Sequence, residues 1–114
     1  MLKLVPRDRA SPDLSGGDCP AMANKAHAAT LRRLSERYGL PNGRLYDLMG
    51  GDLIIEVETA ATVADGIRKL LQAGGRRFVA MTNQESVDDA LLIARTTEIG
   101  VMSPKGDIVK EAGR

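Results

Sequence analysis

Residues 51–82 read GDLIIEVETAATVADGIRKLLQAGGRRFVAMT and contain the strand and helix patterns from which the fold class is inferred. Over residues 52–58, leucine, isoleucine and valine recur at alternate positions, which predicts a half-buried strand. Residues 62–71 place apolar side chains at helical spacing, and residues 77–82 form a second strand that is nearly all apolar. A strand, a helix and a strand in succession predict two parallel strands joined by a right-handed crossover.

The residues after this unit continue the alternation of helix and strand. Residues 87–94 are largely apolar and predict a helix, and residues 99–102 predict a third strand, followed by a turn and a short returning strand. Both predicted helices follow capping-box patterns, formed by Thr62 with Asp65 and by Ser86 with Asp89. We therefore expect residues 51–114 to form an α/β module, a βαβαβ(β) sandwich with a mainly parallel sheet of three or four strands.

The residues before the unit predict helices. Residues 22–38 combine several alanines with an apolar stripe and predict one helix, which Gly39 ends. A second, short helix is expected over residues 43–49. The predicted class is therefore α/β with an N-terminal helical hairpin at residues 22–50, and residues 22–114 are expected to fold as one domain.

Composition and charge narrow the class of protein. The 114 residues are 43% hydrophobic and 27% charged, as in globular domains, although residues 1–21 are rich in proline and glycine and predict a flexible tail. The net charge of +1 creates no general attraction to nucleic acid or to anionic membranes. The single cysteine, Cys19, cannot form an internal disulfide and favours a reducing compartment. Neither a signal peptide nor a membrane-spanning apolar run is recognisable, so a cytoplasmic protein without membrane contact is expected.

Residues 31–50, LRRLSERYGLPNGRLYDLMG, carry an apolar pattern around a glycine-containing turn. The pattern consists of Leu34, Tyr38, Leu40, Leu45 and Leu48, with Ser35 as the small residue and Gly39 at the turn. The segment resembles the helix-turn-helix unit of DNA-binding regulators, which implies a recognition helix that starts near Asn42. The DNA-contact candidates are Arg37, Asn42, Arg44 and Tyr46. The same pattern is also typical of a plain packing hairpin, and both interpretations stay open.

Polar side chains follow the predicted parallel strands at their carboxyl ends. Because open parallel sheets bind ligands in the crevice beyond these ends, the residues there are candidates for a small-molecule or anion site. They are Glu58, Thr59, Thr82, Asn83, Gln84 and Ser103. The same side chains also suit helix caps, and no glycine-rich phosphate loop accompanies them.

Other residues that could take part in metal binding or acid–base chemistry are interpreted as structural. Glu56 and Glu58 share a strand face that is expected to lie in water, and the aspartates at residues 88–89 suit the first turn of a helix. His27 has no acidic or cysteine partner at metal-ligand spacing, so no metal or cofactor is predicted. The arginines in the turn at residues 74–77 are expected to stay in water.

The predicted helix at residues 87–94 motivates the leading functional hypothesis. The helix is too apolar to be covered by so short a chain, and an uncovered apolar face is typical of a partner surface. We therefore expect a non-catalytic regulatory or assembly module that associates with itself. The alternatives are a DNA-binding regulator that uses residues 31–50 and a small-molecule or anion site at the strand ends.

Overall fold

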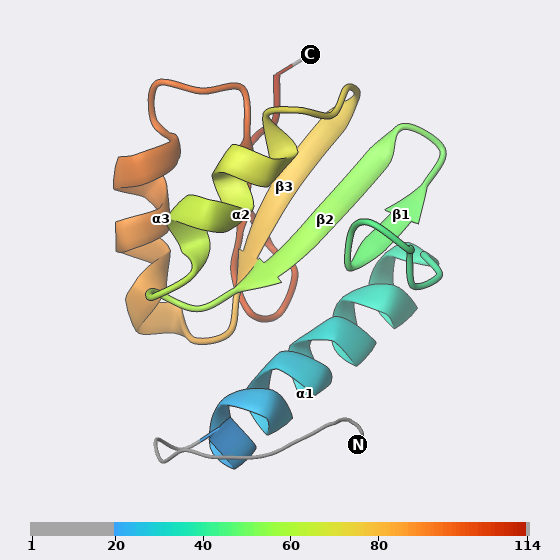
Figure 1. The fold of residues 1–114 in the computed structure, drawn as a ribbon, viewed down its shortest axis with the longest axis vertical. Helices are drawn as coiled ribbons and strands as arrows, with labels where there is room; N and C mark the ends of the chain where they lie inside the picture. Colours follow the sequence, from blue (N-terminus) through green and yellow to red (C-terminus); the bar gives the residue numbers. More distant parts are fainter. Residues whose placement is uncertain (1–19, 114) are drawn as a thin grey trace, which may run out of the picture.

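The computed structural model describes the backbone of residues 20–113 and the side chains of residues 25–113. These residues form helices and strands in alternation (Figure 1). Their bounds are α1 Pro20–Tyr38, β1 Leu48–Gly50, β2 Leu53–Glu58, α2 Val63–Leu70, β3 Arg76–Met81, a 3-10 turn η1 Gln84–Ser86, α3 Val87–Ala94, β4 Gly100–Met102 and β5 Ile108–Lys110. The predicted α/β class is confirmed. Residues 1–19, which hold most of the predicted tail and Cys19, lie outside the described residues.

The strands form one mixed sheet in the order β1-β2-β3-β4-β5. The central strands β2, β3 and β4 run parallel, whereas the edge strands β1 and β5 run antiparallel to their neighbours. Phe78 of β3 lies opposite Gly100 of β4, where a Cβ would come within 2.5 Å of the phenyl ring. The parallel centre agrees with the prediction, and the sheet has five strands where three or four were expected.

Helices cover both faces of this sheet and give the molecule three layers (Figure 1). The α2–α3 side encloses one apolar cluster, made of Ile54, Val63, Ile67, Leu70, Val79, Met81, Val87, Ala90, Ala94, Ile99 and Val101. The α1 side encloses the other, made of Leu34, Leu40, Leu48, Ile55, Val57, Phe78, Ala80 and Met102. Successive residues of β3 thus enter opposite clusters, which explains why this strand is apolar throughout. In the described part of the chain, no helix combines the length and the apolarity that crossing a bilayer requires.

The second helix expected over residues 43–49 is wrong. Leu48–Gly50 form the edge strand β1 instead, and residues 40–47 contain no helix. Gly51 has a φ of 59°, a backbone conformation that favours glycine, and it lets the chain turn back into β2 at once. Because Leu48 is fully buried in the α1-side cluster, strand pairing and burial outweigh the local helical spacing. The predicted helical hairpin is therefore a helix followed by a β-hairpin.

Arg77 is buried, whereas the sequence predicts that it lies in water. It is only 6% exposed, because its guanidinium lies under the end of α2. Its Nη1 donates to the carbonyl oxygens of Leu70 at 3.4 Å and Ala73 at 2.7 Å, and its Nη2 pairs with Glu98 at 2.8 Å. Helix ends leave such carbonyls without helical partners, so Arg77 satisfies the end of α2 and fixes it to β3.

The two predicted capping boxes are not formed. The Thr62 hydroxyl makes no cap hydrogen bond to α2 and instead accepts the Thr59 N–H at 2.9 Å. At the next helical segment, the Asn83 carboxamide oxygen accepts the Ser86 N–H at 2.9 Å, and the Ser86 side chain makes no cap hydrogen bond to α3. In both places, residues of the preceding turn compete for the same short-range hydrogen bonds, which a spacing pattern cannot resolve.

Candidate functional site

Two clefts open near the ends of β2 and β3, at the carboxyl edge of the parallel strands. The acidic cleft has a volume of about 380 Å³ and is lined by His27, Asp47, Glu56, Val57, Glu58, Thr59 and Thr62. The basic cleft has a volume of about 430 Å³ and is lined by Ala26, Ala29, Thr30, Arg33, Thr82, Asn83, Gln84, Pro104 and Lys105. Neighbouring residues of α1 contribute to both clefts, so the two sites adjoin along one helix.

The acidic cleft lies where β1 leaves one edge of β2 open. β1 pairs only with the first three residues of β2, so no described strand lies beside the stretch from Glu56 to Glu58 on that side. Asp47 takes this place, because its Oδ2 accepts the Val57 N–H at 2.8 Å and its own N–H donates to Glu56 Oε2 at 3.1 Å. This exchange of hydrogen bonds holds Asp47 beside the two glutamates of β2.

Glu56 is buried, which corrects the expectation that it lies in water. The residue is only 4% exposed, and its Oε2 lies 3.3 Å from Nζ of Lys69 on α2. The same ammonium lies 5.1 Å from the centroid of the Tyr46 ring, so it is held between an aromatic face and a carboxylate. Burying a carboxylate is costly without a partner, and Lys69 together with the Asp47 N–H provides that compensation.

Glu58 follows on the same face of β2 and lies against the backbone of α2. Gly66 provides the space, since a Cβ at this position would come within 2.5 Å of Glu58 Oε2. Burial raises the pKa of Glu58 to about 7; a hydrogen bond from Thr62 opposes this rise, and the charges of Glu56 and Asp47 add to it. Glu58 therefore changes its protonation state near neutral pH.

The acidic cleft holds more negative than positive charge. Asp47, Glu56 and Glu58 face the single ammonium of Lys69, and His27 Nε2, 3.4 Å from Asp47 Oδ2, adds a positive charge only when protonated. Within residues 25–113, no three His, Cys, Asp or Glu side chains are arranged as ready ligands of one metal ion. An ion bound in this cleft would therefore take most of its ligands from water or from a substrate.

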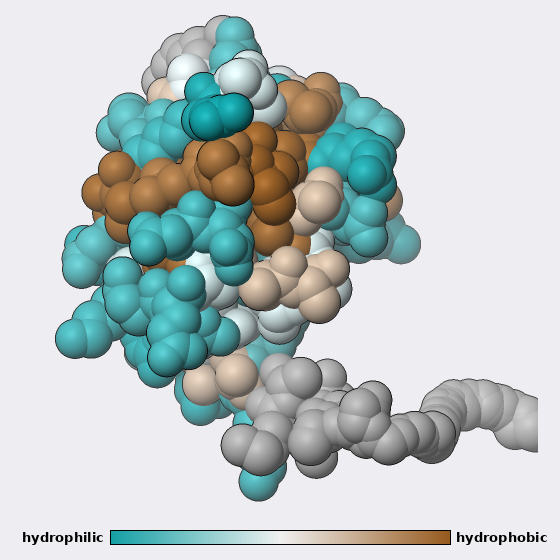
Figure 2. All heavy atoms as spheres, turned by 90° about the vertical axis from the view of Figure 1, so that its left-hand side faces the viewer, coloured by the Kyte–Doolittle hydropathy of each residue, from teal (hydrophilic) through white to brown (hydrophobic). Residues whose placement is uncertain are grey.

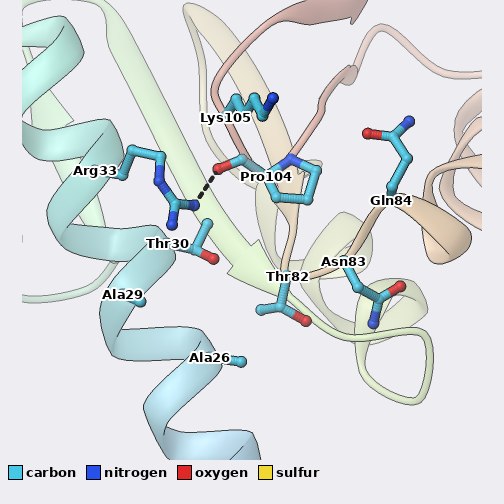
Figure 3. A pocket seen from close by; sticks show the side chains of 9 residues that line it. All are labelled: Ala26, Ala29, Thr30, Arg33, Thr82, Asn83, Gln84, Pro104 and Lys105. Carbon is cyan, nitrogen blue, oxygen red and sulfur yellow. Dashed lines mark hydrogen bonds between the residues drawn. The ribbon is translucent and has the colours of Figure 1, made fainter.

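The basic cleft lies between α1 and the loops that follow β3 and β4 (Figure 3). Arg33 donates from Nη1 to the Pro104 carbonyl oxygen at 2.7 Å and ties the second loop to the helix. Tyr38 at the end of α1 strengthens this attachment by donating to the Gly106 carbonyl oxygen at 2.5 Å. None of the residues that line this cleft is acidic, so Arg33 and Lys105 make it positive.

The predicted ligand crevice is divided between the two clefts. Glu58 and Thr59 line the acidic cleft, whereas Thr82, Asn83 and Gln84 line the basic cleft. Ser103 lines neither cleft. It is buried, and its hydroxyl oxygen accepts the N–H groups of Lys105 at 3.3 Å and Asp107 at 3.1 Å, so it organises the turn between β4 and β5.

The four DNA-contact candidates do not share a helix. Arg37 lies in the last turn of α1 and pairs with Asp107 at 2.8 Å, while Tyr46 packs beside Lys69 and the core. Asn42 and Arg44 lie in the irregular segment before β1, and no helix begins near them. Because α1 is continuous and the expected recognition helix is missing, residues 31–50 lack helix-turn-helix geometry.

Sequence reasoning missed Lys69 and the role of Asp47. Lys69 follows Glu56 by thirteen positions and Asp47 precedes it by nine, so no local sequence pattern connects them to Glu56. One signal was available, because Glu56 stands between Ile55 and Val57 in a strand followed by an amphipathic helix. A glutamate on the strand face that receives such a helix indicates a buried charge that needs a partner.

Comparison with family models, with curated proteins and with solved structures finds no match to this chain.

Proposed function

We propose that the acidic cleft binds a hydrated divalent cation such as Mg²⁺, and that the chain uses this ion to hydrolyse phosphate esters. The observation that carries the proposal is the convergence of Asp47, Glu56 and Glu58 at the open edge of β2. Carboxylate oxygens are preferred ligands of Mg²⁺, which commonly uses one or two of them and completes its shell with water and substrate phosphate.

The excess negative charge of the cleft supports a cation rather than an anion as its ligand. The raised pKa of Glu58 means that a proton relieves the repulsion near neutral pH, and a divalent cation would relieve the same repulsion by displacing that proton. Lys69 is held in place by Glu56 and Tyr46, so its ammonium is already positioned beside the site.

The residues of the acidic cleft have different roles in the proposed reaction. The ion would lower the pKa of a bound water and neutralise charge on the phosphoryl group. Glu56 and Glu58 would hold the ion, and Lys69 would stabilise negative charge on the phosphoryl oxygens. His27, oriented by Asp47, would accept the proton of the attacking water. The water oxygen bonds to phosphorus, the ester P–O bond breaks, and the leaving oxygen takes up a proton from solvent.

Metal binding and hydrolysis are tested with Mn²⁺ and a generic phosphodiester, bis(p-nitrophenyl) phosphate. We expect the full chain to quench the paramagnetic resonance signal of free Mn²⁺ and to release nitrophenolate when Mn²⁺ or Mg²⁺ is present. The double variant Glu56→Gln, Glu58→Gln should lose both properties. The matched control Asp88→Asn, Asp89→Asn removes the same charge from α3 and should keep both. Equal Mn²⁺ binding by the two double variants would contradict the proposal.

We also propose that the chain associates with itself through the outer side of α3. Val87, Ala90 and Ala94 of this helix are buried, whereas Leu92 is 60% exposed and Ile93 39%. Figure 2 looks onto this side of the molecule and shows apolar surface gathered there. Because α1 packs on the opposite face of the sheet, it leaves this surface uncovered, and a second copy of the chain would bury it.

The oligomeric state tests this second proposal. We expect light scattering during gel filtration to give a mass above that of one chain, and Leu92→Glu to reduce it to the monomer. Leu45→Glu is the matched control, since Leu45 is 72% exposed but precedes β1 and lies outside α3. A monomer at all concentrations, or equal effects of both substitutions, would refute it.

A further inference from the structure

Thr30 carries a buried hydroxyl group without a partner. The residue is 2% exposed, and within the described residues its hydroxyl makes no hydrogen bond. Threonine in a helix usually bonds a carbonyl of the preceding turn, and buried polar groups without any partner are rare. Figure 3 shows this hydroxyl directed from α1 into the basic cleft. It is therefore available to a ligand there.

Two positively charged side chains, Arg33 and Lys105, line the same cleft as this hydroxyl. Arg33 lies one turn further along α1 and is fixed by its hydrogen bond to the Pro104 carbonyl oxygen. Lys105 enters from the next loop, and its ammonium has no ion-pair partner among residues 25–113. The acidic residue of the same loop, Asp107, is paired with Arg37 at 2.8 Å, so it does not neutralise the cleft.

The opposite wall of the basic cleft adds neutral polar groups. The Asn83 carboxamide oxygen is occupied by the Ser86 N–H, so its amide nitrogen remains as a donor. Thr82 and Gln84 line the same wall from the loop that follows β3 (Figure 3). Two cations together with hydroxyl and amide donors form the kind of arrangement that binds an oxyanion with several oxygens.

We infer that the basic cleft binds the phosphate group of a small organic molecule. The phosphate oxygens would accept hydrogen bonds from Thr30, Arg33 and Lys105. The cleft volume of about 430 Å³ is in the range of small-molecule sites. Ala26 and Ala29 provide an apolar wall for the organic part of the ligand. This site is separate from the acidic cleft, and the inference holds whether or not that cleft binds a cation.

Titration calorimetry at constant ionic strength with a chelator present tests the inference, with inorganic phosphate and phenyl phosphate as probes. We expect both to bind, phenyl phosphate more tightly because its ring covers the alanine wall. Thr30→Val and Lys105→Met should each weaken binding by about tenfold, which corresponds to about 1.4 kcal/mol. Arg32→Met is the matched control, since it removes the same charge as Lys105→Met from a part of α1 that does not line this cleft.

Further measurements separate the inference from misfolding, from the acidic cleft and from nonspecific anion binding. Thr30→Val should unfold at the same urea concentration as the parent chain or higher, so loss of binding in this variant cannot be attributed to misfolding. The Glu56→Gln, Glu58→Gln variant should keep its affinity for phosphate, which separates this inference from the proposed cation site. The inference would be overturned if Arg32→Met weakened phosphate binding as much as Lys105→Met does. It would also be overturned if chloride at the same ionic strength bound as well as phosphate. Equal affinity for both probes would overturn the assignment of an organic ligand.

Discussion

Replacing Glu58 with glutamine should change how the stability of the fold depends on pH. The pKa of this carboxyl is about 7 in the folded chain, compared with an ordinary value of 4.5. The native state therefore retains a proton that the unfolded state has lost between these two values. The stabilisation is fully present below pH 4.5 and is lost as the pH rises through 7, because Glu58 must then ionise beside Glu56 and Asp47. Glutamine mimics the protonated carboxyl and does not ionise.

The size of the effect follows from the shift and from the exposure of the side chain. A rise from 4.5 to about 7 sets an upper limit of about 3 kcal/mol. Because Glu58 is only partly buried, solvent screening reduces the expected value to about 1–2 kcal/mol. The unfolding free energy of Glu58→Gln, relative to that of the parent chain, should therefore rise by this amount from pH 5 to pH 8.5. Each kcal/mol corresponds to a rise of about 4–8 °C in Tm.

Urea unfolding at pH 5 and at pH 8.5, in the absence of divalent cations, measures this difference directly. All other ionisable groups are the same in both proteins, so their contributions largely cancel when the parent is subtracted at each pH. Glu36→Gln is the control, because Glu36 is exposed on α1 and the same chemical change there should leave the pH dependence unaltered. If the difference in unfolding free energy between Glu58→Gln and the parent is the same at both pH values, the repulsion inferred for the acidic cleft is absent.

Three further substitutions test the elements that hold the acidic cleft and α2 together. Lys69→Met leaves Glu56 buried without its cation and should lower the unfolding free energy by about 1–3 kcal/mol in urea titrations. Gly66→Ala favours the helix by up to about 1 kcal/mol but displaces the neighbouring glutamate, so Mn²⁺ affinity should fall while stability changes little. Arg77→Leu removes the donor to the carbonyl oxygens of Leu70, the last residue of α2, and of Ala73 just after it, and should cost about 2–4 kcal/mol in the same titrations; a loss below about 0.5 kcal/mol would contradict the role of Arg77.

Short-range patterns in the sequence were sufficient for the centre of the fold. The alternation in β2 and the apolar run in β3 predicted their strand character, and the amphipathic spacing between them predicted α2. These features depend on which faces of a segment are buried, and a repeat of two or of 3.6 residues encodes that directly. The same reasoning placed Thr82, Asn83 and Gln84 at the carboxyl edge, where they now line the basic cleft.

Local patterns failed wherever a distant partner decided the outcome. Residues 43–49 have helical spacing, yet Leu48–Gly50 form a strand because β2 offers hydrogen-bond partners and the α1-side cluster buries Leu48. The turn pattern predicts that Arg77 lies in water, yet the end of α2 lies over it and the carbonyl oxygen of Ala73 accepts a hydrogen bond from it.

The acidic cleft shows most clearly what each level of structure decided. The alternation of residues 53–58 is enough to predict that Glu56 and Glu58 share one face of a strand, because side chains two positions apart in a strand point the same way. Three further features depend on the packing of distant segments: α2 covers this face, Asp47 occupies the open edge of β2, and Lys69 reaches Glu56. Burial and electrostatic pairing depend on groups that are distant in sequence, and those effects turn two ordinary glutamates into a site whose protonation changes near neutral pH.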